Sequence, residues 1–176
     1  MSLWEILQGH LQKPEYLHVL LNPLPVYGVA LGIVALILAI ILRSRRAQIV
    51  ALILLFISAA SAWPVAEFGE QSYDILKSRS DDIGAHWLDA HGQRATRALP
   101  AFYALAALAL AAAGAPWKYP KCSTPLNVLT LLLSIAVLGL GIWIAFAGGQ
   151  VRHKEFRFPE NAVPSESLGG YEKMER

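Results

Sequence analysis

Apolar residues gather in four long stretches of this chain, and none of these stretches contains Asp, Glu, Lys or Arg. They cover residues 24–42, 47–66, 98–117 and 122–151. A helix of about 20 apolar residues crosses a hydrocarbon core of about 30 Å. The pattern therefore predicts four transmembrane helices over about 24–42, 47–66, 98–117 and 122–147. The expected fold class is all-α: an integral membrane four-helix transmembrane bundle in a single domain, residues 1–158.

Two segments beside these stretches, residues 2–21 and 68–97, have amphipathic patterns. In the first, leucines at four-residue spacing predict an interfacial helix that breaks near Pro14. In the second, Ser80 is expected to be the N-cap of the second helix of a hairpin. We expect the two segments to form an extracytoplasmic helical cap, and the polar tail 159–176 to be disordered. The chain shows no obvious internal repeat.

Composition and charge narrow the function classes. The 176 residues are 55% apolar and 16% charged, whereas soluble domains have about 25% charged residues. A net charge of +2 leaves no basic face for nucleic acid, so nucleic-acid binding is not expected. The spans also lack the ionisable residues that pumps and transporters use at membrane depth. We therefore expect no enzyme, or at most a redox subunit without its own substrate site.

The short links between spans predict the orientation. Residues 43–46 and 118–121 are rich in Arg and Lys and contain no acidic residue. Basic residues in short loops stay in the cytoplasm. Both termini, and the segment between the second and third spans, are therefore expected outside.

Gly28 and Gly32 form a GxxxG pattern in the first span. This pattern lets two helix backbones approach closely. It predicts a tightly packed helix pair, and the same face is also a possible docking surface for other membrane subunits or for a second copy of the chain. One functional alternative is therefore a non-catalytic accessory or assembly subunit of a membrane complex, with lipid as its main surroundings.

All five histidines lie on the expected outer side, and three of them adjoin spans: His18, His91 and His153. A pair of imidazoles from facing helices is the axial ligand set of a b-type haem. We expect His91, with His18 or His153, to hold one haem there. Cations that would pair with its propionates are Arg94, Arg97 and Arg152.

Two other interpretations of the histidines stay open. Neutral imidazoles with carboxylates bind zinc, copper, nickel or non-haem iron. The predicted divalent-metal site consists of His91, His153 and Glu70, with Glu67 and Asp74 on the same helical face. Alternatively, the histidines are structural and bond headgroups, water or backbone carbonyls.

The chain resembles an uncharacterised family of small four-helix bacterial membrane proteins, classed as a domain of unknown function. That family opens with a pattern like HPxxVHFPIAL and closes with a Gly-Gly pair followed by His. His18 and Pro25 are in register with this opening, Gly69 and His91 fall where the family tends to have Gly and His, and the closing reads Gly148-Gly149 followed by His153, which lies about two residues closer to the Gly pair than in the family. Pro23 replaces the second opening histidine of the family. The resemblance implies a bacterial inner-membrane location and a cytochrome-like bundle, and no established activity.

Overall fold

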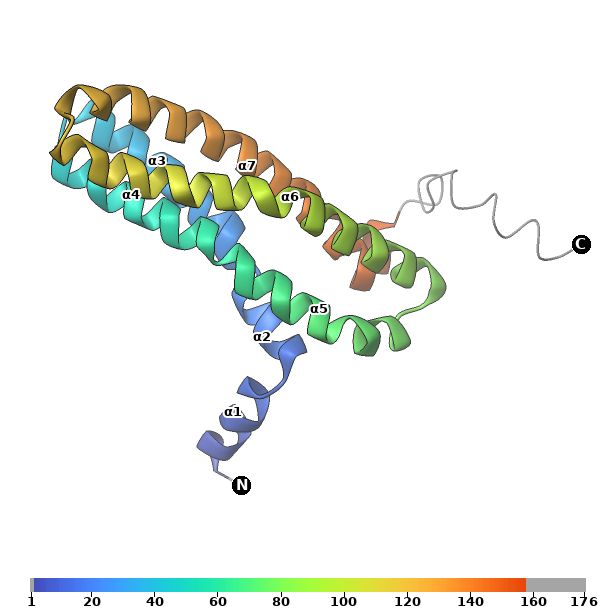
Figure 1. Cartoon of the computed structure of the whole chain (residues 1–176). Helices are drawn as coiled ribbons and strands as arrows, with labels where there is room; N and C mark the ends of the chain where they lie inside the picture. The colour runs from blue at the N-terminus through green and yellow to red at the C-terminus, as the bar shows by residue number, and fades with distance from the viewer. Residues whose placement is uncertain (1, 158–176) are drawn as a thin grey trace, which may run out of the picture.

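The computed structural model describes residues 2–157, which are helical with no β-strand among them (Figure 1). Four helical segments are long and apolar enough to span a membrane: Pro14–Ile41, Arg45–Ser78, Asp82–Trp117 and Pro120–Arg152. The predicted all-α class with four membrane-length helices is confirmed, and it is compatible with a multi-pass membrane protein. The expected disordered tail, residues 159–176, lies outside the described residues.

The spans form an up-and-down bundle in which consecutive helices are neighbours. Helix α3 packs on α4, α4 on α6, α6 on α7, and α7 closes the ring on α3. Their bounds are Val29–Ile41 for α3, Arg45–Ala60 for α4, Asp82–Gly114 for α6 and Ser123–Arg152 for α7. Leu36, Leu52, Leu105 and Val137, one from each helix, are fully buried in the core. Many other large apolar side chains of the spans are exposed, as they are on a lipid-facing surface.

The GxxxG pattern lies at the contact between α3 and α4. A Cβ atom on Gly28 would collide with Ser58 Oγ, and one on Gly32 would lie 2.5 Å from Leu55 Cδ2. Both glycines therefore permit close packing inside the chain. The face that the sequence offered as a docking surface for a partner helix is already covered by α4.

Two prolines redirect the chain where it enters the first span. Pro23 and Pro25 lack N–H groups, and a π turn, Leu24–Gly28, separates α2 (Pro14–Leu21) from α3. Before this π turn, and within the same helical segment Pro14–Ile41, α2 packs along α5 (Ala62–Ser78) (Figure 1). This packing places the histidine of α2 beside α5.

The first helix, α1 (Leu3–Leu11), extends from α2 and buries no residue within the chain. It begins at Ser2 with a capping box completed by Glu5, and its break from α2 falls before Pro14, as the sequence predicts. Its exposed apolar side chains include Leu3 and Trp4. This exposure is typical of an amphipathic helix at a membrane interface.

The segment predicted as a cap, residues 68–97, continues the spans as α5 and the first turns of α6. Helix α6 begins at Asp82 with Asp81 as its N-cap, and the Asp81 carboxylate accepts the Gly84 N–H at 2.8 Å. The expected N-cap, Ser80, instead donates its hydroxyl to the Leu76 carbonyl. The prediction is wrong by one residue because the extended backbone and the carboxylate acceptor are both at Asp81.

Asp81 also ties the end of α7 to the turn between α5 and α6. Lys154 Nζ lies 3.0 Å from Asp81 Oδ2, and Arg157 Nη1 donates to both carboxylate oxygens at 2.9 and 3.0 Å. Arg157 also donates to the carbonyls of Gln150 and Val151. Bonds from Lys154, from the Gly84 N–H and from Arg157 lower the pKa of Asp81 to about 2.

A second polar network closes the opposite end of the bundle, where the basic links lie. Arg45 donates to the carbonyls of Ala112 and Ala113 at 3.0 and 2.9 Å, near the end of α6. Deeper in the bundle, Asn127 Nδ2 donates to Gln48 Oε1 at 2.9 Å. Arg45 therefore belongs to the basic link and also caps carbonyls at the end of another helix.

Candidate functional site

Two of the five histidines meet at the end of the bundle away from the basic links. His18 comes from α2 and His91 from α6, and both side chains are half-buried. Their ring centroids are 6.3 Å apart, and the ring planes are nearly perpendicular, at 87°. The structure thus brings together one of the two histidine pairs that the sequence suggested.

His18 is held in place by α5. Its Nδ1 atom bonds the backbone carbonyl of Val65 at 2.8 Å. One turn further along α5, a Cβ atom on Gly69 would lie 3.0 Å from both Cε1 and Nδ1 of the ring. The His18 imidazole therefore lies directly against helix backbone that has no side chain.

His91 is held by α7 in the same way. Its Nδ1 atom bonds the carbonyl of Ile144 at 3.0 Å. A Cβ atom on Gly148 would lie 3.0 Å from Nδ1 and 3.1 Å from Cε1 of this ring. In both cases the accepting carbonyl belongs to the residue four positions before the glycine.

These bonds fix which ring nitrogen carries the hydrogen when each imidazole is neutral. A carbonyl oxygen can only accept, so each Nδ1 carries the hydrogen and each neutral ring keeps its lone pair on Nε2. Metal-binding histidines use the same backbone bond to orient the ring. A metal bound about 2 Å from a nitrogen of each ring would hold the centroids about 6 Å apart. The observed spacing fits such a ligand.

The two segments that hold the rings are also related in sequence. Residues 65–71 read VAEFGEQ, and residues 144–150 read IAFAGGQ. Both begin with a β-branched residue that supplies the carbonyl, and they share Ala, Gly and Gln at the same spacing. We call them the two cradle segments. Their common spacing is the sequence feature that accompanies His18 and His91, and it leaves the expectation of no obvious internal repeat unchanged.

The third candidate, His153, lies apart from this pair. It follows the last turn of α7, its Nδ1 bonds Glu155 Oε1 at 2.8 Å, and its ring stacks on Phe156. The side chain is exposed. The alternative haem pair of His91 and His153 is therefore not preorganised as the His18–His91 pair is.

The predicted three-residue metal site is not formed either. Within residues 2–157, no three His, Cys, Asp or Glu side chains are grouped so that they hold a metal ion. Glu70 is exposed on α5 although it follows Gly69, and His153 is bonded to Glu155. Glu67 and Asp74 are likewise exposed on α5.

The three candidate arginines have different surroundings. Arg94, one turn beyond His91, donates to the Trp143 carbonyl at 2.8 Å, and its guanidinium lies over the rings of Trp143 and Trp87. Arg97 lines a separate cleft, and Arg152 is exposed at the end of α7. Of the three, only Arg94 is close along α6 to a histidine of the pair.

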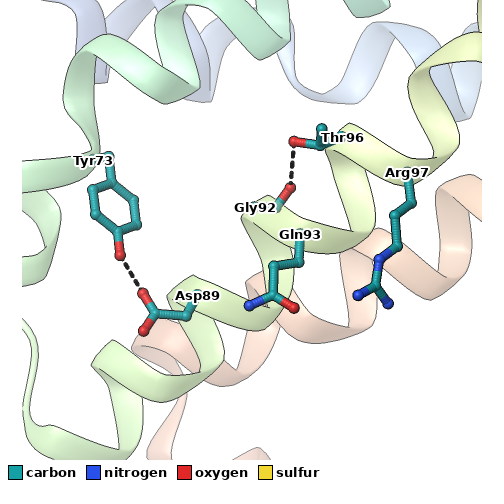
Figure 2. A pocket seen from close by; sticks show the side chains of 6 residues that line it. All are labelled: Tyr73, Asp89, Gly92, Gln93, Thr96 and Arg97. Atoms are coloured by element: carbon teal, nitrogen blue, oxygen red, sulfur yellow. Dashed lines mark hydrogen bonds between the residues drawn. The ribbon is translucent and has the colours of Figure 1, made fainter.

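The cleft beside Arg97 has a volume of about 530 Å³ and is open to the outside. Tyr73 of α5 donates to Asp89 of α6, and Lys77 Nζ lies 3.1 Å from the same carboxylate. Figure 2 shows the lining residues, with Tyr73 on α5 and the others along α6. At 3.6 residues per turn, Asp89, like Gln93 and Thr96, lies on the side of α6 opposite His91. The cleft and the histidine pair are therefore separate features.

Comparison with known proteins adds no further information on family or activity. No family model matches the chain, and no curated protein or solved structure is significantly similar to it. The resemblance to a four-helix bacterial membrane family thus stays a prediction.

Proposed function

We propose that this chain holds one b-type haem between His18 and His91 and acts as a haem-binding or electron-transfer subunit in a membrane. The observation that supports this proposal is the pair of perpendicular imidazoles, each with Nδ1 bonded to a carbonyl and Nε2 left for a ligand. When bound, the haem iron supplies one-electron chemistry.

The chain's own groups orient and tune the two ligands. The carbonyls of Val65 and Ile144 accept from the rings, which makes Nε2 more basic and a stronger ligand. Gly69 and Gly148 leave space for the rings against α5 and α7. We assign no second haem, because the chain has no histidine near the basic links at the other end.

We further propose that the protein lies in the bacterial inner membrane with both termini outside. The basic links, residues 43–46 and 118–121, support this orientation because such loops stay in the cytoplasm. The exposed Cys122 adjoins the second link and reports on it. A membrane-impermeant maleimide should label Cys122 only from the cytoplasmic side. Labelling from the outer side would reverse the orientation.

An absorbance spectrum tests the haem proposal directly. The full-length protein, purified after haem-replete expression, should show a Soret band with one haem per chain. His18→Ala and His91→Ala should each abolish the six-coordinate low-spin spectrum, because either change removes one axial ligand. His153→Ala is the matched control and should leave the spectrum unchanged. A protein without a Soret band, or a low-spin spectrum that survives both replacements, refutes the proposal.

A further inference from the structure

We infer that Gly69 and Gly148 are positioning residues that hold the two histidine rings perpendicular, so that a haem at this site has crossed axial imidazole planes. The inference rests on the proposed haem site and adds a property that haem binding alone does not require. It starts from the 87° angle between the rings of His18 and His91.

Each ring is fixed by two contacts of different kinds. The bond from Nδ1 to a carbonyl fixes one edge of the ring but still permits rotation about that bond. The ring also lies beside the position that a methyl group on the glycine would occupy, so the glycine leaves the space that this ring orientation uses. A Cβ atom 3.0 Å from the ring is well inside the optimal carbon contact of about 3.5–4.0 Å. An added methyl group therefore requires the ring to shift by a few tenths of an ångström from its present orientation.

Other glycines of the same helices do not have this role. A Cβ atom on Gly92 of α6 or on Gly139 of α7 would have no heavy atom within 4 Å. The close approach of an imidazole ring occurs at the fifth position of each cradle segment. In both segments this position follows the accepting carbonyl by four residues.

The angle between axial imidazoles has a measurable electronic consequence. Crossed planes leave two iron d orbitals nearly equal in energy, whereas parallel planes split them. A low-spin ferric haem with crossed imidazoles therefore gives a strongly anisotropic electron paramagnetic resonance signal, and parallel planes give a rhombic signal. The signal reports ring orientation, which a change in protein stability alone does not alter.

The experiment compares spectra of the oxidised, haem-loaded, full-length protein. We expect the unaltered chain to give the strongly anisotropic low-spin signal. Gly69→Ala and Gly148→Ala should each lower the anisotropy of this signal, because the displaced ring departs from the perpendicular orientation. Gly92→Ala and Gly139→Ala are the controls and should keep the original signal.

A second measurement removes the other contact that fixes the ring at position 91. In His91→Gly, added 1-methylimidazole can occupy the vacated ligand position, but it has no N–H to donate to the Ile144 carbonyl. Because this ring has lost one of its two fixing contacts, its signal should be less anisotropic than that of the unaltered chain, and Gly148→Ala in the same variant should lower the anisotropy further. No added effect of Gly148→Ala in this variant, a rhombic signal in the unaltered chain, or equal effects of all four glycine changes would overturn the inference while leaving the haem site intact. A chain that binds no haem overturns both proposals.

Discussion

The two ends of the bundle use polar side chains in opposite ways. At the end with the basic links, Arg45 donates to two backbone carbonyls of α6, and Asn127 donates to Gln48. At the other end, His18 and His91 each bond one carbonyl through Nδ1 and keep Nε2 for a further partner.

This difference distinguishes a structural network from a binding site. Donors that satisfy carbonyls at a helix end remove the cost of leaving those groups unpaired, and their bonds stay within the chain. An imidazole ring that makes one hydrogen bond through Nδ1 contributes less to stability than a donor with several bonds. Because this bond orients the ring, the ring is preorganised to bind a ligand through Nε2. The comparison therefore predicts that changes at the Arg45 end mainly lower the free energy of unfolding, and that changes at the histidine end mainly alter haem binding.

The largest effect on stability is expected at the Arg45 end. Arg45→Ala removes bonds from a charged donor to the Ala112 and Ala113 carbonyls, and it should lower the free energy of unfolding by about 3 kcal/mol. Haem content should not change. Arg46→Ala is the matched control, because Arg46 is exposed and its replacement removes the same charge from the link. Unfolding in detergent micelles measures the difference, and equal losses in the two variants would contradict the assigned role.

A smaller stability effect is expected at the histidine end. In the haem-free protein, His91→Ala removes one hydrogen bond to Ile144 and should cost about 1 kcal/mol. The same change should abolish the low-spin haem spectrum. The comparison between the ends fails if His91→Ala destabilises the haem-free protein as much as Arg45→Ala does.

The smallest effect concerns the contact between Asp81 and the end of α7. The pKa of Asp81 is lowered from 3.8 to about 2, so its carboxylate stabilises the folded state above pH 3.8. This contribution is lost as the pH falls from 3.8 through about 2. Asp81→Asn should reduce the decline of the melting temperature in that range, whereas Asp82→Asn, an exposed neighbour, should not. Identical pH profiles for both variants would exclude this role of Asp81.

The accessory-subunit alternative receives no support from the packing of the first span. Gly28 and Gly32 permit a close helix approach, but the approaching helix is α4 of the same chain. A GxxxG pattern describes only the surface of one helix, so it does not indicate whether the partner is internal or external.

Much of the fold follows from local properties of the sequence. Charges are costly in hydrocarbon, so the charge-free stretches identified the four spans. Proline lacks an N–H group, so Pro14 marked the break after α1. The length of α6 was harder to predict, because its amphipathic first turns, before the charge-free stretch, have the pattern of a separate cap helix.

The candidate site depended on information that the sequence carries only in part. The histidines and the two cradle segments are present in it, yet seven-residue segments with three identities do not stand out until their contacts are known. The choice between His18 and His153 also required the path of the chain. His18 reaches the pair because α2, which precedes the π turn after Pro23, packs on α5. His153 lies after the end of α7, where its Nδ1 bonds Glu155.

By itself, the sequence determined that four helices are long and apolar enough to cross a membrane and that every histidine lies outside the charge-free stretches, because solvation of charge depends on local composition. Only the tertiary structure decided that His18 and His91 form the pair, that their rings are perpendicular, and that α4 covers the GxxxG face. These features are contacts between helices distant in the chain, and their geometry is set by how the helices pack.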